Sequence, residues 1–501
     1  MCVLCDSGES LADTVRRYGF PPPPPLSRRR LIMSAGVMAG GMAAQGLTGG
    51  ALAQGAAAAD PELARVQAQR RILLKGGIVL SLDPQVGDFA EGDVLIEDGR
   101  IREVRPGISA SPETTAIVDA THRIIIPGFV DTHSHSYQGL LRGTLPNGRV
   151  QPEYDRDIQN NITLHYQPED AYAGVLITVL AMLDMGTTGV VDISQANHSP
   201  EHSDAMIQAL RDAGIRAVFA YSRGAGPKAQ YPQDIARLLK THFNSPDQLL
   251  TPAMATSLDP KSFLAAREAG VRGVLHIRLN SNALIELAKA GVLRDGDEFI
   301  HCTHLNDEAW TVIRDHGART SHSPPLEMAM GHGYPAIQDA LDHGVRPSLS
   351  CDHAATVGMD MFGMMRTAFN LQRLAAQQRT MKKEDGVPPL LTCREVLEFA
   401  TINGARCAAL DGRIGTLTPG KEADIVMLKG DEISVWPLNN APSAVVNLMN
   451  PSHVENVFVA GKVRKWRGRL VGVDVARVLK TVADSRDAVL KRANFTVGMV
   501  E

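Results

Sequence analysis

The sequence predicts an α/β fold, a (β/α)8 TIM barrel with a small discontinuous β-sandwich domain formed by both ends of the mature chain. Three observations predict it. Strand-like and helix-like segments alternate between residues 124 and 352. Several of the strand-like segments end in a histidine or an aspartate. Short alternating strands with an Asp-Gly turn precede the barrel, and similar strands return near 423–430 and 454–465.

Eight strand-like segments support the barrel, because parallel strands need a crossover connection to return the chain. Helix-patterned stretches such as 261–269 and 307–316 lie between them, and this alternation indicates a parallel sheet. The predicted strands are 124–135, 186–194, 216–222, 251–257, 273–280, 297–305, 318–325 and 346–353. Eight such units close into a barrel, whose functional groups sit at the carboxyl ends of the strands.

The first of these strands ends on two histidines, His133 and His135, in the string I-I-I-P-G-F-V-D-T-H-S-H. Successive side chains of a strand alternate between its faces, so residues two apart point to the same side. A neutral imidazole keeps a lone pair on one ring nitrogen and suits zinc, iron or a similar ion. Such a pair alone is also compatible with hydrogen-bonded core histidines. The polar ends of the later strands favour a metal site.

Three later strands bring polar groups to the same end of the predicted barrel. His276 lies on the strand at 273–280, His301 on the strand at 297–305, and Asp352 ends the eighth strand. Because the carboxyl ends of parallel barrel strands meet at one mouth, we expect these side chains to lie together with His133 and His135.

The chain resembles the amidohydrolase superfamily, in its branch near cytosine deaminase and the triazine and chlorohydrolase enzymes. The motifs that carry the resemblance are P-G-F-V-D-T-H-S-H at 127–135, Q-G-L-L-R-G at 138–143, H-C-T-H-L at 301–305, G-H-G-Y-P at 331–335, C-D-H at 351–353, T-I-N-G-A-R at 401–406 and I-G-T-L-T-P-G-K-E-A-D-I-V at 414–426. The resemblance implies a metal-dependent hydrolase of non-peptide carbon–nitrogen bonds.

The same resemblance implies roles for the polar strand ends. It places one metal ion on His133, His135, His276 and Asp352, and it places His301 against the substrate or the bound water. The segment 251–257 has neither a lysine nor an acid, so the bridging group of the binuclear members is missing and one divalent ion is expected. Zinc is the expected ion, with iron, cobalt or manganese as alternatives.

One departure from the family pattern concerns the fifth strand. Deaminases of this branch usually carry H-x-H-x-x-E there, whose Glu transfers a proton to the ring nitrogen. With His276 as the first histidine, the second slot holds Arg278 and the Glu slot holds Ser281. With His276 as the ligand itself, Leu279 lies three residues later, again without a carboxylate. His276 is kept as the ligand, because arginine offers no lone pair.

The expected chemistry follows from these groups. A bound divalent ion lowers the pKa of its water to about 7. Asp352 is expected to accept the proton of the attacking water and to pass it to the departing nitrogen, and His301 to hydrogen-bond the developing oxyanion. The predicted substrate-binding residues lie on loops at the barrel mouth and are Gln138, Arg142, Glu327, His332 and His304. Glu327 is also a candidate for the acid that replaces the missing glutamate. For each of these residues, a structural hydrogen bond is the alternative.

The segment before the barrel predicts export. S-R-R-R-L-I-M at 27–33 matches a twin-arginine motif, followed by an Ala- and Gly-rich run that ends in A-L-A at 51–53. A periplasmic or secreted product, with the twin-arginine machinery as a partner, is therefore expected. The expected organisation is a leader at 1–58, the sandwich at 68–126 and 413–472, the hydrolase barrel at 127–412, and a C-terminal helix and tail at 473–501.

Composition excludes several function classes. The net charge of −4 offers no basic field for nucleic acid or an anionic membrane. Cys2 and Cys5 leave with the predicted leader, and the four remaining cysteines have no C-x-x-C spacing. A small-molecule substrate is the expected partner, and a homo-oligomer is left open. The favoured function is hydrolysis of an amide, lactam, carbamate or ring amidine. The alternatives are an aminohydrolase or dechlorinase that uses a substitute acid, and a non-catalytic ligand-binding barrel of the same ancestry.

Overall fold

A computed structural model describes residues 60–500. The predicted leader and its twin-arginine motif lie outside the described residues, so the expectation of export stays a prediction. Within the described part, no helix combines the length and the hydrophobicity that crossing a membrane requires.

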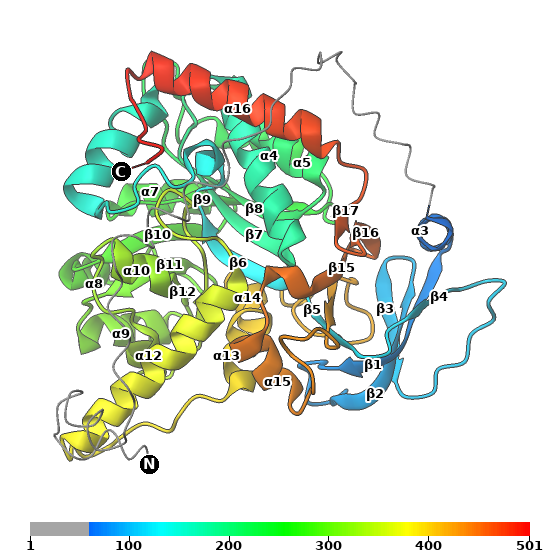
Figure 1. The fold of residues 1–501 in the computed structure, drawn as a ribbon. Coiled ribbons are helices and arrows are strands. Elements are labelled where there is room, and N and C mark those ends of the chain that lie inside the picture. Colours follow the sequence, from blue (N-terminus) through cyan, green and yellow to red (C-terminus); the bar gives the residue numbers. More distant parts are fainter. Residues whose placement is uncertain (1–59, 501) are drawn as a thin grey trace, which may run out of the picture. The chain divides into compact units, whose positions relative to one another are not determined.

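Eight parallel strands form the barrel in sequence order, as predicted, and helices surround it (Figure 1). The strands are β6 (Phe129–Ser134), β7 (Thr187–Ser194), β8 (Arg216–Tyr221), β9 (Leu250–Ala255), β10 (Gly273–Arg278), β11 (Glu298–Thr303), β12 (Arg319–His322) and β13 (Pro347–Leu349). Backbone hydrogen bonds close the ring, because the Asp352 N–H donates to the His133 carbonyl and the His135 N–H donates to the Asp352 carbonyl. Closure therefore brings the first and eighth strand ends together.

The first predicted strand is wrong at its beginning. Residues 124–127 belong to β5 (Arg123–Pro127), which pairs with the second sheet rather than with the barrel. The barrel begins after Gly128, where an added Cβ would lie 2.1 Å from the Thr188 hydroxyl oxygen. One continuous apolar run in the sequence therefore forms strands of two different sheets. Both strands are almost entirely buried, so the apolar run gives no sign of the boundary between β5 and β6.

The second sheet draws its strands from both sides of the barrel segment, as predicted. Its order is β17-β16-β15-β14-β5-β1-β2-β3, with β4 paired to β1. The remaining strands are β1 (Arg71–Val79), β2 (Phe89–Glu97), β3 (Arg100–Arg105), β4 (Ala116–Asp119), β14 (Ile425–Lys429), β15 (Val454–Val459), β16 (Lys462–Trp466) and β17 (Arg469–Leu470). These strands form one continuous hydrogen-bonded network, in which β1 pairs with β4 along its first half and with β5 along its second half.

The helices of the barrel begin at positions that the sequence marks well. Proline stands in the first turn of α4, α5 and α7. The side chains of Asp259, Asn306 and Thr392 accept backbone N–H groups at the starts of α7, α9 and α13, in that order. The helices from α4 to α14 are α4 (Pro168–Asp184), α5 (Pro200–Ala213), α6 (Ile235–His242), α7 (Pro260–Glu268), α8 (Ser281–Lys289), α9 (Asp307–Asp315), α10 (Pro324–Ala329), α11 (Ile337–Asp342), α12 (Met361–Met381), α13 (Cys393–Phe399) and α14 (Ile402–Cys407).

The other helical segments lie at the ends of the described chain or in loops. They are α3 (Pro61–Ala68), η1 (Ser136–Leu141), η2 (Val150–Gln159), η3 (Ile162–His165), α15 (Ala441–Ser443), η4 (Ala444–Leu448), η5 (Pro451–His453) and α16 (Val475–Arg492). The helix α16 begins after Asp474, whose side chain accepts the Arg477 N–H. It packs against α4 (Figure 1), so the predicted C-terminal helix is present.

A buried arginine at the amino end of β8 connects the barrel to the segment that leads into β14. The Arg216 side chain is fully buried, and its guanidinium donates to both oxygens of Asp424 at 2.9 Å and to Glu422 at 2.6 Å. Both carboxylates are at most one-tenth exposed. Since a buried charge is costly without its partner, loss of the Arg216 guanidinium would be expected to destabilise the fold.

Candidate metal centre and active site

The end of β6 presents His133 and His135 to the barrel mouth. Every residue of β6 is buried, and the two imidazole centroids lie 4.7 Å apart. The Asp131 carboxylate accepts the backbone N–H groups of His133 and Cys351, so it fixes this strand end against the eighth strand. The His135 Nδ1 lies 3.1 Å from the Ile193 carbonyl. An N–H at Nδ1 leaves the Nε2 lone pair free for a metal ion.

The other predicted ligands meet the first two. The ring of His276, from β10, lies 4.7 Å from that of His133 and 5.3 Å from that of His135. Asp352 Oδ1 lies 3.3 Å from His133 Nε2 and 3.6 Å from His135 Nε2. The donor atoms of His133, His135 and His276 lie within 4.8 Å of one another, and so do those of His133, His301 and Asp352. The structure therefore brings these predicted groups together in two overlapping donor sets that share His133.

The electrostatics of this cluster favour metal binding. Burial lowers the pKa of His133, of His135 (to about 4) and of His276, so these rings stay neutral at pH 7. Burial alone would raise the pKa of Asp352, but the facing imidazoles of His133 and His353 outweigh it and hold that pKa well below its ordinary range. The site thus combines neutral imidazoles with one carboxylate, which is a donor set for a divalent transition metal.

Several buried donor atoms in this cluster have no hydrogen-bond partner among the described residues. They are both ring nitrogens of His133, Nε2 of His276 and Oδ1 of Asp352. Buried polar atoms are rarely left unpaired, since each costs about 1–3 kcal/mol. Two donors around one zinc ion, each at about 2.0–2.2 Å, lie roughly 4 Å apart or less. The separations and the unpaired atoms therefore fit a bound metal ion.

His301, on β11, lies beside this cluster with a carboxylate behind it. Its Nε2 is 3.6 Å from Asp352 Oδ2, and its Nδ1 is 3.1 Å from Glu327 Oε1. The Ser323 N–H also donates to Glu327 Oε1, at 2.9 Å. Glu327 is fully buried, and burial raises its pKa to about 7, whereas burial lowers the pKa of His301 to about 4. Both pKa shifts disfavour an ion pair between Glu327 and His301. The two side chains can therefore share and exchange one proton near neutral pH.

A cavity of about 360 Å³ opens onto the metal ligands and His301. His332 lines it, as predicted, and its ring centroid is 4.4 Å from that of His301. The ring of Tyr154, from η2, stacks on His353 at 4.7 Å and forms part of the same wall. The remaining lining side chains are Val150, Asp155, Gln159, Gln195, Ile277, Arg278 and Asn280.

Four predicted substrate-binding residues do not line this cavity. Gln138 is fully buried and donates to the hydroxyls of Tyr137 and Tyr154, so it supports the wall from behind. Arg142 is exposed and donates to the Ile177 carbonyl.

The other two residues are displaced by local backbone geometry. His304 has left the strand, with a φ of 60°, and its exposed ring lies against Gly333. Glu327 contacts His301 from the side opposite the cavity instead of facing a substrate. Their placement corrects the prediction that all four face a ligand.

Sequence reasoning missed several polar residues of the cavity as binding groups, among them Tyr154, Asp155 and Arg278. Tyr154 and Asp155 come from η2, a loop helix with no repeat or motif that marks it. Arg278 is a residue that the sequence excludes as a metal ligand, and its place on the cavity wall is not predicted. The signal that could have found it is its spacing, because residue i+2 on a strand shares the face of His276.

The fifth strand supplies no carboxylate in either alignment. Leu279 has a φ of 62° and is 66% exposed, so the strand ends there and the side chain faces outwards. Ser281 begins α8, and its hydroxyl accepts the Asn306 N–H. Among the described residues, Asp352 and Glu327 are the carboxyl groups that lie within 4 Å of the ring nitrogens of His133, His135 and His301.

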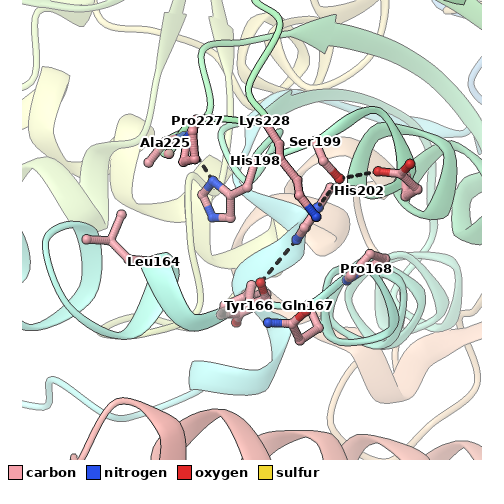
Figure 2. Close-up of a pocket in the computed structure, with 12 residues that line it drawn as sticks. Leu164, Tyr166, Gln167, Pro168, His198, Ser199, His202, Ala225, Pro227 and Lys228 are labelled. Atoms are coloured by element: carbon pink, nitrogen blue, oxygen red, sulfur yellow. Dashed lines mark hydrogen bonds between the residues drawn. The ribbon is translucent and has the colours of Figure 1, made fainter.

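A larger cavity, of about 610 Å³, lies beside η3 and the loops after β7 and β8. Figure 2 shows hydrogen bonds from the Ala225 N–H to His198 and between His202 and the Tyr166 carbonyl. His198 lies between the Thr163 carbonyl and the Ala225 N–H, and His202 lies between Ser199 and the Tyr166 carbonyl. Because both ring nitrogens of each histidine have partners, this cavity offers no free donor pair for a metal ion.

Comparisons with known proteins agree with this geometry. A family model described as "Amidohydrolase family" matches residues 124–464. A 5'-deoxyadenosine deaminase from Methanosarcina mazei is 26% identical over 448 residues, which cover 84% of this chain and 99% of the relative. A 5-methylthioadenosine/S-adenosylhomocysteine deaminase from Desulforudis audaxviator is 28% identical over 441 residues, covering 82% of this chain and 97% of the relative.

Solved structures share the fold at lower identity. An adenosine deaminase from Xanthomonas campestris with bound zinc aligns with a TM-score of 0.73 at 21% identity, covering 84% of this chain and 98% of the neighbour. An atrazine chlorohydrolase from Arthrobacter aurescens, complexed with zinc, aligns with a TM-score of 0.74 at 21% identity, covering 83% and 100% of the two chains.

Proposed function

The chain belongs to the amidohydrolase family, and on that premise we propose that it hydrolyses a non-peptide carbon–nitrogen bond of a small organic molecule. The observation that carries the proposal is the convergence of three imidazoles and one carboxylate on a point at the mouth of the barrel. We propose zinc as the ion, because two structural neighbours are zinc-bound and the donor set suits it.

His133, His135, His276 and Asp352 would hold this ion. When bound, a divalent ion lowers the pKa of a coordinated water to about 7 and polarises the carbon under attack. Asp352 is placed to accept the proton of that water, since its low pKa keeps it ionised. The same carboxyl group can then deliver the proton to the departing nitrogen, which leaves as an amine or as ammonia.

His301 and Glu327 form the second proton-handling pair of the proposed mechanism. An Nδ1–H of His301 donates to Glu327, so its Nε2 faces Asp352 and the cavity. In that orientation the imidazole can exchange a proton with the substrate or hydrogen-bond the developing oxyanion. Glu327 acts through His301 as a positioning residue. This arrangement supports hydrolysis in a chain whose fifth strand carries no glutamate.

The curated relatives named above are deaminases and one structural neighbour is a chlorohydrolase, so the leaving group needs a direct test. We expect purified enzyme to hydrolyse at least one member of a panel of cyclic amides, aryl amides, carbamates and amino-substituted heterocycles. Removal of the metal with a chelator should abolish turnover, and one equivalent of Zn²⁺ should restore it. Ammonia and chloride assays would identify the leaving group. Turnover that persists in metal-free enzyme would contradict the proposal.

A further inference from the structure

Arg278 is a cation in the active-site cavity that the mechanism above does not use. It follows His276 by two residues on β10, so both side chains point to the inside of the barrel. Arg278 lines the cavity together with His276, His301 and Asp352. His332 lines the same cavity.

Among residues 60–500, the Arg278 side chain makes no hydrogen bond and has no carboxylate oxygen within 4 Å. Two arginines at the amino ends of barrel strands differ from it. Arg216 and Arg272 each pair with a buried carboxylate. The Arg278 side chain is partly exposed, so its five N–H donors are free to bind a ligand or water in the cavity. Its planar fork matches a carboxylate in geometry.

The charge balance of the cavity points the same way. Arg278 contributes one positive charge to the cavity, and Asp155 and Asp352 contribute one negative charge each. Imidazoles that bind a metal ion through a ring lone pair are neutral. A divalent ion on Asp352 and the histidines adds two positive charges. Before the coordinated water loses a proton, these charges leave a net positive charge in the cavity, which favours an anionic ligand.

We propose that the substrate carries a carboxylate, and that Arg278 binds this group while the scissile carbon–nitrogen bond lies at the metal site. This inference rests on the proposed function, since it assumes that the metal centre and the cavity form one active site. It also gives a reason for the arginine in the slot that holds a second histidine in the H-x-H-x-x-E pattern. Arg278 is thus a specificity-determining residue.

Binding of matched neutral and anionic probes tests the inference. Benzamide and 4-carbamoylbenzoate differ by one carboxylate, and isothermal titration of zinc-loaded protein would measure both dissociation constants. A charge-assisted hydrogen bond contributes about 1.5–3 kcal/mol, so the anion should bind roughly 10- to 100-fold more tightly. Arg278→Gln should reduce this ratio to near one, and Arg278→Lys should retain part of it. Arg486→Gln, on the exposed side of α16, is the matched control and should leave the ratio unchanged.

Three outcomes would overturn the inference: equal affinity for the two probes in the wild type, no binding of either probe, and an anion preference that survives in Arg278→Gln. The last outcome would mean that the carboxylate binds the metal ion instead. Metal analysis of the same samples separates this inference from the proposed function. A zinc-loaded wild type without an Arg278-dependent preference contradicts only the role of Arg278, whereas protein that takes up no metal contradicts the metal centre itself.

Discussion

Replacement of His301 with asparagine is expected to lower kcat/KM for the hydrolysed substrate by about 10²–10⁴-fold, the usual contribution of a positioned proton-transfer group. The reason is that His301 is not one of the four proposed metal ligands, yet its Nε2 lies 3.6 Å from Asp352 Oδ2. That nitrogen is therefore available for proton transfer at the reaction site. Glu327→Gln should cause a smaller loss, of roughly tenfold or more, because it removes the charge behind Nδ1 but keeps an oxygen acceptor. Steady-state kinetics over a range of pH would measure both effects.

The controls for this prediction separate chemistry from folding. Glu286→Gln removes an exposed carboxylate of α8 that pairs only with Lys289, so its kinetics should match those of the wild type. Zinc content and unfolding midpoint should stay close to wild type in the Glu327 variant. A change in the pH profile of kcat/KM, without a loss of zinc, would distinguish positioning of His301 from a merely structural contact. Wild-type kcat/KM in His301→Asn would refute its role.

Replacement of Arg216 with methionine is expected to lower the free energy of unfolding by about 3–5 kcal/mol, the typical cost of breaking a buried ion pair by removing one partner. The change would leave Glu422 and Asp424 buried without their shared cation. Denaturant unfolding followed by circular dichroism would measure it. The matched control is Arg70→Met, because Arg70 is 81% exposed and pairs with Asp98 on the surface. An exposed pair contributes about 0–1 kcal/mol, so equal losses in the two variants would contradict this account.

The barrel could be predicted from the sequence because its signals are local. Apolar runs that alternate with helical stretches define the strands, and the i, i+2 spacing of His133 and His135 defines a common face. Asp352 follows the eighth strand, and ring closure then places it against the first strand end. The metal cluster therefore follows from strand order plus closure. The strand start at residue 124 was wrong, because an apolar run does not show which sheet each half joins.

The substrate side of the site could not be predicted in the same way. Tyr154 reaches the cavity through the fold of a loop helix, and Glu327 turns behind His301 because its backbone lies at the first turn of α10. His304 leaves the cavity because the backbone at His301 and Cys302 already has positive φ angles, which ends the regular alternation of the strand. Loop paths and such irregularities depend on tertiary contacts, whereas strand periodicity does not.

The metal content of purified protein tests the central claim most directly. Wild-type protein, freed of loosely bound ions by dialysis, should contain about one equivalent of a divalent transition metal by elemental analysis. His133→Ala should contain far less, because His133 belongs to both groups of donors that converge at the barrel mouth, and its circular dichroism spectrum should remain that of a folded barrel. Folded wild-type protein without metal, or a His133→Ala variant that keeps a full equivalent, would contradict the account.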